Sequence, residues 1–346
     1  MLTRKIKIKD LEIGGNNSIP VQSMLNVPLK DTANALAQIH ALEQAGCQII
    51  RAAVPDKENA AALKAIIKET QVPFVADIHF DYRLAIQAIE SGVHKLRINP
   101  GNIGGRERVK EVVACLKEYR IPVRIGVNGG SLEKELLEQY HSSCPEALVE
   151  SARRSIDYFN EFGYDNIVVS IKSSDVPTTI VANRLFSQQY DYPLHLGVTE
   201  AGAQLSGIVR SSVGLGALLM EGIGDTIRVS LTGDPVQEVT AGKEILKALN
   251  LLEEGVHIVS CPTCGRCKTD ILSIVTQIKD LTLDVKKPVT VAVMGCAVNG
   301  PGEAKEADMG VACGNGNGVF FKKGNIEKTL KTKEIIPYLV EEIRKF

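Results

Sequence analysis

The sequence predicts a parallel (β/α)8 TIM-type barrel of the α/β class, followed by a small α+β domain. From about residue 19 to residue 250, short runs rich in β-branched residues alternate with amphipathic segments, and eight such units suit a barrel. An open doubly wound sheet fits less well, because no GxGxxG sequence follows the first run. The alternation stops near residue 253, and five of the eight cysteines then follow within 53 residues.

The predicted elements follow one another at even spacing. The strands are the apolar runs at 19–25, 47–54, 73–79, 95–99, 122–127, 166–172, 193–199 and 226–232. Amphipathic segments between them predict helices, among them 32–45, 57–70, 106–119 and 145–162, and a helix at about 235–251 completes the set. Residues 1–18 predict a small β-hairpin that turns at Gly14-Gly15 and plugs the lower end of the barrel.

Two domains are expected. Residues 1–252 form the barrel with its hairpin, and residues 253–346 form the second domain, which begins with Glu253-Glu254-Gly255 as a linker. Within the second domain, the sequence predicts a helix at about 269–279, a strand at 288–294 and a terminal helix at about 333–345. Because this domain is small and rich in cysteine and glycine, we expect a metal centre to stabilise it.

Composition excludes several classes of function. The net charge is −1, so the surface as a whole is not a polyanion binder, and the absence of Trp argues against base stacking on nucleic acid. No apolar run approaches the roughly 18 residues that a membrane helix needs, and the N-terminus does not resemble a signal peptide. We therefore expect a soluble, cytoplasmic protein that binds neither nucleic acid nor membranes.

Charged residues occur inside predicted strands that should be apolar, because both faces of a barrel strand are buried. Five strand runs carry Arg51, Arg97, Arg124, Lys172 and Arg228. Since side chains alternate along a strand, Asn128 shares a face with Arg124, and Ser230 shares one with Arg228. Converging cations would repel one another unless an anion joined them, so this pattern predicts a site for a small di- or polyphosphate.

Two alternatives stay open at this point. Each arginine could pair with a local carboxylate instead of a ligand. Glu200, which ends the seventh predicted strand, could act as a proton donor or base, or it could be the ion-pair partner of one arginine.

The cysteines of the second domain have the spacing of a metal site. Cys261, Cys264 and Cys267 form a Cys-x-x-Cys-x-x-Cys sequence, and Cys296 precedes Asn-Gly-Pro-Gly-Glu303. Thiolates at this spacing hold zinc or an iron–sulfur cluster. Five cysteines exceed the four ligands of one site, so spacing alone chooses neither the metal nor the ligand set.

Eight stretches, in order along nearly the whole chain, resemble the 4-hydroxy-3-methylbut-2-enyl diphosphate synthase family in its two-domain bacterial form. They are VQSM at 21–24, ADIHF at 76–80, LRINPGNIG at 96–104, RIGVNGGSL at 124–132, VTEAG at 198–202, GIGDTIRVSLTGDP at 222–235, SCPTCGR at 260–266 and GCAVNGPGEA at 295–304. The last two stretches are the most specific of the eight.

The resemblance implies site residues that spacing alone leaves open. It implies a 4Fe–4S cluster whose ligands fall by motif on Cys261, Cys264, Cys296 and Glu303. A carboxylate binds iron more weakly than a thiolate, so one iron could exchange its ligand. Cys267 departs from this ligand pattern. The resemblance also implies that Glu200 handles protons and that the substrate's diphosphate is bound by Arg51, Arg97, Arg124, Asn128, Lys172, Arg228 and Ser230.

By the same resemblance, the chain is expected to be an oxidoreductase of the methylerythritol phosphate route to isoprenoids. It would open the ring of 2-C-methyl-D-erythritol 2,4-cyclodiphosphate by two-electron reduction and dehydration, giving 4-hydroxy-3-methylbut-2-enyl diphosphate. Flavodoxin or ferredoxin would donate the electrons. The family is a homodimer in which the cluster domain of one subunit caps the barrel of the other.

Two other hypotheses compete with this one. The first is a barrel transferase that resembles the pterin-dependent synthases and has a zinc-stapled accessory domain, and it predicts a colourless protein without iron. The second is a non-catalytic electron-transfer or binding module, which leaves the cations in the strands unexplained.

Overall fold

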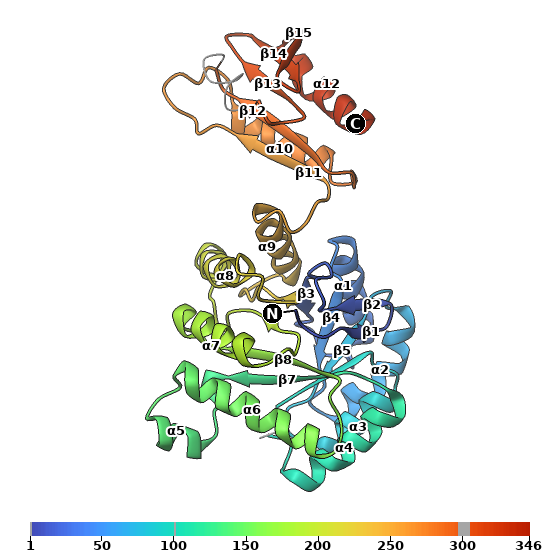
Figure 1. Cartoon of the computed structure of the whole chain (residues 1–346). Coiled ribbons are helices and arrows are strands. Elements are labelled where there is room, and N and C mark those ends of the chain that lie inside the picture. Colours follow the sequence, from blue (N-terminus) through green and yellow to red (C-terminus); the bar gives the residue numbers. More distant parts are fainter. Residues whose placement is uncertain (1, 100–101, 297–304) are drawn as a thin grey trace. The chain divides into compact units, whose positions relative to one another are not determined.

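The computed structural model describes residues 2–99, 102–296 and 305–346, which divide into two compact units (Figure 1). The first unit comprises residues 1–251 and the second comprises residues 252–346. Each unit has its own sheet and its own buried core, so each is described by itself.

The first unit begins with an antiparallel hairpin, β1 (Ile6–Ile8) and β2 (Leu11–Ile13). The apolar side chains of this hairpin pack against the starts of three barrel strands, at Ile49, Val75 and Val168. The predicted plug at the lower end of the barrel is therefore confirmed.

The predicted turn of the hairpin is wrong by several residues. The chain turns at Lys9-Asp10, where Lys9 has a φ of 54°, and Gly14-Gly15 follows the second strand. Glycine is required at position 14 for a different reason, because a Cβ atom there would clash with the carbonyl oxygen of Arg4. The glycine therefore permits a close backbone approach at the base of the hairpin instead of forming its turn.

Eight parallel strands form the predicted TIM barrel. They are β3 (Gln22–Met24), β4 (Ile49–Ala53), β5 (Phe74–Asp77), β6 (Lys95–Ile98), β7 (Val123–Asn128), β8 (Ile167–Lys172), β9 (His195–Leu196) and β10 (Thr226–Ile227). The first six make one continuous parallel sheet, and the last two make a short parallel pair. Single bridges, Val169 to Leu194 and Val21 to Ile227, join the two sheets into a closed ring.

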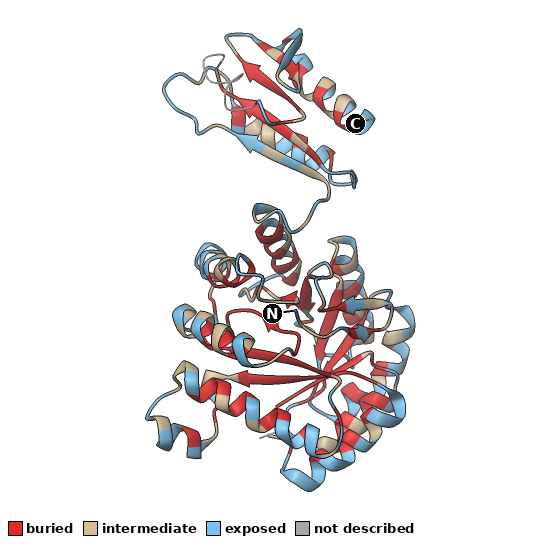
Figure 2. Cartoon of the chain, in the orientation of Figure 1, coloured by how far each residue is buried: buried red, intermediate tan, exposed pale blue. Residues whose placement is uncertain are grey.

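In the described part of this unit, eight helices surround the strands, and their outward faces are exposed (Figure 2). They are α1 (Thr32–Gln44), α2 (Lys57–Glu69), α3 (Tyr82–Glu90), α4 (Arg106–Tyr119), α6 (Pro145–Glu161), α7 (Val176–Gln189), α8 (Gln204–Leu219) and α9 (Pro235–Ala248). A short extra helix, α5 (Lys134–Tyr140), follows β7. An aspartate side chain caps the first turn of five outer helices by accepting a backbone N–H bond, which fixes where each helix begins.

The strand register places the lumen side chains in layers drawn from alternate strands. The lowest layer contains Ile49, Lys95, Val168 and Thr226. The second layer contains Gln22, Val75, Arg124 and His195, and the third contains Arg51, Arg97, Ser170 and Arg228. The fourth contains Met24, Asp77, Gly126 and Gly197. Polar groups therefore fill most of the lumen above the apolar plug.

The second unit is an α+β domain built on one five-stranded sheet, in the order β11 (Val256–Ser260), β12 (Val289–Met294), β13 (Met309–Cys313), β14 (Asn317–Lys322) and β15 (Asn325–Lys331). The first three strands are parallel, and the last two form an antiparallel hairpin. Helices α10 (Ile271–Leu281) and α12 (Thr332–Lys345) pack their apolar residues on one face of the sheet. Sequence reasoning placed both helices and β12 but missed the other four strands.

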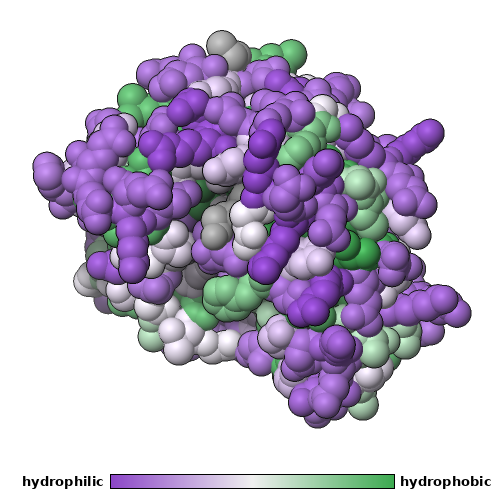
Figure 3. All heavy atoms as spheres, turned by 90° about the horizontal axis from the view of Figure 1, so that it is seen from below, coloured by the Kyte–Doolittle hydropathy of each residue, from purple (hydrophilic) through white to green (hydrophobic). Residues whose placement is uncertain are grey.

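Viewed from below, the surface is hydrophilic over most of the visible face, with apolar side chains in small patches (Figure 3). In the three described ranges, no helix has both the length and the apolar character to cross a bilayer.

Candidate active site

The structure brings the strand cations together in the barrel lumen. Arg51, Arg97, Arg124 and Lys172 are buried, and the side chain of Arg228 is 17% exposed. Burial lowers the pKa of Arg51 to about 10, although Asp77 opposes this change. Such burial of like charges is costly, and the lumen must supply partners for them.

Asp77 is the first of these partners. Its carboxylate lies 3.0 Å from Arg97 Nη1 and 3.7 Å from Arg51 Nε, and His79 Nε2 lies 3.5 Å away. Burial alone would raise the pKa of Asp77, but the charge of Arg51, the hydrogen bond from His79 and the charge of Arg97 hold that pKa far below its usual range. Asp77 is therefore ionised and fixes two of the five cations.

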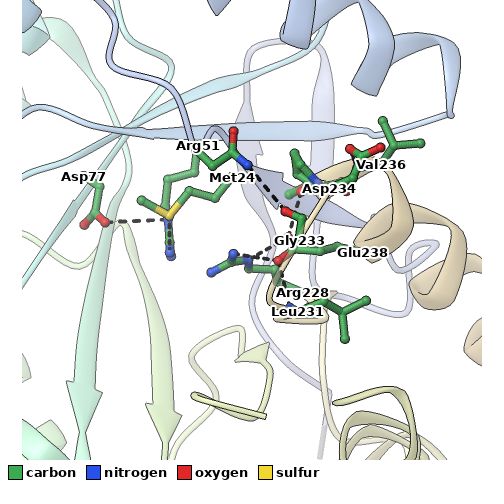
Figure 4. A network of polar contacts seen from close by, with 12 residues as sticks. Met24, Arg51, Asp77, Arg228, Leu231, Gly233, Asp234, Val236 and Glu238 are labelled. Carbon is green, nitrogen blue, oxygen red and sulfur yellow. Dashed lines mark hydrogen bonds and ion pairs between the residues drawn. The ribbon is translucent and has the colours of Figure 1, made fainter. Parts of the chain in front are cut away.

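Glu238 is the second partner, and sequence reasoning missed it. Helix α9 carries Glu238 on its buried face, where it accepts two hydrogen bonds from Arg228, at 2.9 and 3.2 Å, and one from Ser23 Oγ, at 2.9 Å (Figure 4). The signal was present in the sequence, because Glu238 shares a helix face with Pro235 and Val239. A carboxylate on an apolar helix face indicates a buried cationic partner.

Arg124 has no such partner among the residues that the structure describes. Its Nε and Nη1 atoms are buried and form no hydrogen bond with any described residue. Burial, with the nearby charges of Arg51 and Arg97, lowers its pKa. The predicted alternative of local carboxylate pairing thus holds for Arg51, Arg97 and Arg228 and fails for Arg124.

Two lumen glycines provide the space that the cations occupy. A Cβ atom on Gly126 would lie 2.6 Å from Arg97 Nε, and one on Gly197 would lie 2.6 Å from Lys172 Nζ. Both side chains therefore lie across a glycine of a neighbouring strand.

A polar cavity opens at the carboxyl ends of β7, β8 and β9, where TIM-barrel enzymes bind their substrates. It has a volume of about 400 Å³, and its lining includes Asn128, Ser143, Ser173 and Glu200. Glu200 is exposed and has a φ of 53°, a strained conformation for this residue type that is concentrated at functional sites. Asn128 and Glu200 thus line one cavity, and Ser230 is half-buried beyond the end of β10.

The cysteines of the second unit gather at one end of its sheet. Cys261, Cys296 and Cys313 stand at or just beyond the carboxyl ends of the parallel strands β11, β12 and β13. Cys261 packs against the sheet face that bears Ala292 and Met294. Cys267 packs against the opposite face, beneath the helices, where a Cβ atom on Gly295 would lie 2.6 Å from its Sγ. The two thiols therefore pack against different faces of the sheet, although both lie beside Gly295, just past the end of β12.

The thiols at Cys261 and Cys264 have the surroundings of metal-binding thiolates. Cys261 Sγ accepts a hydrogen bond from the Gly295 N–H at 3.1 Å, and hydrogen bonds from Arg266 lower the pKa of Cys264. This donor chemistry suits an iron–sulfur cluster. Within the described ranges, no three His, Cys, Asp or Glu side chains lie close enough together to hold a metal. Glu303, the fourth predicted ligand, lies outside the described residues.

Comparison with known proteins identifies the family. The model described as "GcpE TIM-barrel domain" matches residues 3–243, and the one described as "GcpE protein C-terminal domain" matches residues 257–345. The chain belongs to the GcpE family.

A curated relative from Caldanaerobacter subterraneus subsp. tengcongensis is 56% identical, covering 99% of this chain and 97% of its own length. One from Caldicellulosiruptor saccharolyticus is 53% identical, covering 99% and 98%. Both relatives are named 4-hydroxy-3-methylbut-2-en-1-yl diphosphate synthase (flavodoxin), so the predicted family is confirmed.

Solved structures resemble the GcpE barrel in fold alone. A truncated 3-deoxy-D-arabino-heptulosonate 7-phosphate synthase from Thermotoga maritima aligns with a TM-score of 0.52 at 13% identity, covering 72% of this chain and 94% of its own. Dihydropteroate synthase from Yersinia pestis aligns with a TM-score of 0.51 at 12% identity, covering 71% and 98%. The family match supports the synthase hypothesis and not the pterin-dependent transferase hypothesis.

Proposed function

We propose that this chain is an iron–sulfur oxidoreductase that converts 2-C-methyl-D-erythritol 2,4-cyclodiphosphate into 4-hydroxy-3-methylbut-2-enyl diphosphate by two-electron ring opening and loss of water. One observation carries the proposal, namely a ring of buried cations with too few carboxylates, in a barrel that belongs to the GcpE family. The curated relatives are named for this product.

The cations bind and orient the diphosphate. Arginine matches phosphate oxygens with its planar fork, and lysine adds a point charge. Asp77 and Glu238 hold three of the arginines in place before the ligand arrives, which lowers the cost of ordering them. The unpartnered Nε and Nη1 atoms of Arg124 gain hydrogen bonds to phosphate. The full binding set is Arg51, Arg97, Arg124, Asn128, Lys172, Arg228 and Ser230.

Glu200 is the proposed catalytic acid–base. It shares the polar cavity with Asn128, at the carboxyl ends of the strands, and its backbone is held in a strained conformation. A carboxyl group in this place can hold or deliver the proton that accompanies the departure of water from the substrate. The exposed position of Glu200 keeps it in exchange with solvent protons until the site is covered.

Cys261, Cys264, Cys296 and Glu303 are the proposed ligands of a 4Fe–4S cluster, which supplies single electrons to the substrate when bound. The N–H of Gly295 donates to Cys261, and Arg266 donates to Cys264. Donors of this kind stabilise the added negative charge of a reduced sulfur centre. Cys267 points to the other side of the sheet and is left out of the ligand set.

We propose flavodoxin as the electron donor, because the names of the curated relatives specify it. A cytoplasmic location is consistent with this proposal, since a charged diphosphate does not cross a bilayer unaided.

We also propose a homodimer in which the cluster domain of one subunit caps the barrel of its partner. Helix α8 supports self-association, because it exposes a stripe of apolar side chains, Leu205, Val209 and Val213, with Met220 exposed just past its end, and the helix carries one charged residue, Arg210. Beside this stripe, α8 and α9 line an apolar groove of about 480 Å³. A stripe of this kind marks an interaction surface.

The test is turnover by anaerobically prepared protein with a measured iron and sulfide content. We expect consumption of the cyclic diphosphate when a strong reductant is added, and broad visible absorption from the cluster. The variant Glu303→Ala should lose turnover or cluster, whereas Cys267→Ser should keep both. A colourless protein that binds zinc and leaves the cyclic diphosphate intact would overturn the proposal.

A further inference from the structure

A sixth basic side chain lies in the lumen, below the five predicted cations. Lys95 is fully buried in the lowest layer, on the same strand face as Arg97. Its Nζ atom has no hydrogen-bond partner among the described residues. The sequence signal was its place two residues before Arg97 in the run at 95–99.

Two more polar side chains beside Lys95 also lack partners. Gln22 and His195 belong to the layer directly above and are fully buried. The two amide atoms of Gln22 and the Nε2 atom of His195 form no hydrogen bond with a described residue, while His195 Nδ1 lies 2.7 Å from Thr226 Oγ1. The floor of the lumen thus holds four unsatisfied polar atoms on three side chains.

The charges around Lys95 do not stabilise its protonated amine. The basic groups that act on it are Arg124 from β7 and Arg51 from β4, and both repel it. The two lumen carboxylates act elsewhere, since Asp77 contacts Arg97 and Arg51, and Glu238 contacts Arg228. A buried amine without a partner destabilises a fold whether it stays charged or gives up its proton, and an apolar side chain of the same length would be more stable here.

An anion in the layer above reverses this balance. Arg124 belongs to the second layer, and its Nε and Nη1 atoms lack partners among the described residues, so we place the anion beside it. Lys95 belongs to the layer below and lies close enough to Arg124 for the two charges to repel each other. Lys95 would then meet an anion from beneath, while Arg51, Arg97 and Arg228 meet it from the layer above.

We propose that the Lys95 amine, with the side chains of Gln22 and His195, forms the floor of the anion site and binds a phosphate group from below. This inference rests on the proposed function, because the anion is a phosphate of the proposed substrate. It adds a contact surface that the five predicted cations lack, and it explains why polar groups continue below Arg124 toward the apolar plug.

The Lys95 amine should take up a proton when an anion binds above it. Burial first, and then the charges of Arg124 and Arg51, hold the pKa of Lys95 well below its usual range. The other titratable groups that face the floor are His195, whose pKa is also lowered by burial and by these cations, and Asp77 above it. A bound anion favours the charged amine, so Lys95 takes up a proton as the anion binds.

The test uses the full-length protein, inorganic pyrophosphate as the probe and Lys95→Met as the main variant. Without pyrophosphate, Lys95→Met should raise the Tm, because it removes an unpaired buried amine. With pyrophosphate, the variant should show a smaller rise in Tm than the wild type, and its Kd should be roughly tenfold to a hundredfold weaker. Gln22→Met supplies a second variant with the same expected loss of affinity, in case Lys95→Met fails to fold.

The matched control is Lys64→Met, which removes an exposed lysine from α2. Calorimetry in two buffers of different ionisation enthalpy then counts the protons taken up on binding. Wild-type protein and Lys64→Met should take up more protons than Lys95→Met. A purely structural lysine would not change this count.

The outcomes separate this inference from the proposed function. If Arg124→Met abolishes pyrophosphate binding while Lys95→Met leaves both the Kd and the proton count unchanged, the anion site stands and its proposed floor is wrong. If wild-type protein does not bind pyrophosphate, the proposed function loses its phosphate site and this inference is overturned with it.

Discussion

The substitution Gly126→Ala tests whether the lack of a side chain at Gly126 allows Arg97 to take its position in the anion site. The new Cβ atom would lie 2.6 Å from Arg97 Nε, 2.7 Å from its Nη2 and 3.0 Å from its Cζ. These contacts are too short to persist, and the guanidinium is the movable partner because it ends a flexible side chain. Arg97 must therefore leave its position over Gly126 and give up part of its 3.0 Å contact with Asp77.

The magnitude follows from what Arg97 contributes. A hydrogen bond to a charged group contributes about 1.5–3 kcal/mol, so pyrophosphate should bind roughly tenfold to a hundredfold more weakly. Stability should change little, because replacing glycine by alanine restricts the unfolded chain and adds about 0.4–1 kcal/mol, which offsets part of the loss. Titration calorimetry measures the Kd, and urea unfolding measures the stability.

The same change made in an Arg97→Met background gives a double-mutant cycle. If the alanine acts through Arg97, Gly126→Ala should cost almost no further affinity once the guanidinium is gone. Gly216→Ala on α8 is the matched glycine control, because a Cβ atom there meets nothing within 4 Å. An unchanged Kd in Gly126→Ala, or an equal loss of affinity in both backgrounds, would refute the reasoning.

The remaining predictions concern charge, iron and assembly. Asp77→Asn leaves Arg51 and Arg97 without their carboxylate and should lower the free energy of unfolding at pH 7 by about 3 kcal/mol. Because the folded pKa of Asp77 lies below its unfolded value, this contribution is present above about pH 4 and is lost as the pH falls further, so the urea midpoints of the two proteins should converge there. Cys267→Ser should retain iron per chain in anaerobic preparations, whereas Cys264→Ser should lose it, and equal loss in both would show that the ligand set is wrong. Val209→Glu places a charge on the exposed stripe of α8 and should give a monomer in light-scattering measurements, while Val181→Glu on α7 should not.

The barrel could be predicted because its signals are local. Alternating runs and amphipathic segments set the order of elements, and aspartate caps mark where five helices begin. Strands β9 and β10 are shorter than the runs that predicted them, since regular pairing joins only Thr226 to His195 and Ile227 to Leu196. The hairpin prediction misplaced the turn because Gly14 is needed for its close backbone approach to Arg4 and does not form the turn.

The lumen could be predicted only in part. A charge inside an apolar strand run stands out, which is why five cations were found from sequence. Glu238 comes from a helix, and only tertiary packing brings it to Arg228. Lys95 was passed over because it begins its strand run, where a lysine is unremarkable unless the register is known.

The second unit gave weaker signals. Four of its five strands were missed, and β15 shows why, since six of its seven residues are exposed and their polar character does not alternate. The cysteine spacing was informative because metal ligation needs thiols at short intervals along the chain. Which side of the sheet each thiol faces depends on the strand ends and could not be read from spacing.

The surplus of positive charge in the lumen has a practical consequence for anyone who handles the purified protein. Six basic side chains, Lys95 among them, face two carboxylates in the part of the lumen that the structure describes. Sulfate or phosphate from a buffer will enter such a chamber, and a bound ion stabilises the folded state by an amount that grows with the logarithm of its concentration above the Kd. Melting temperatures recorded in phosphate will therefore exceed those in a zwitterionic buffer, and steady-state assays in phosphate will report an inflated KM.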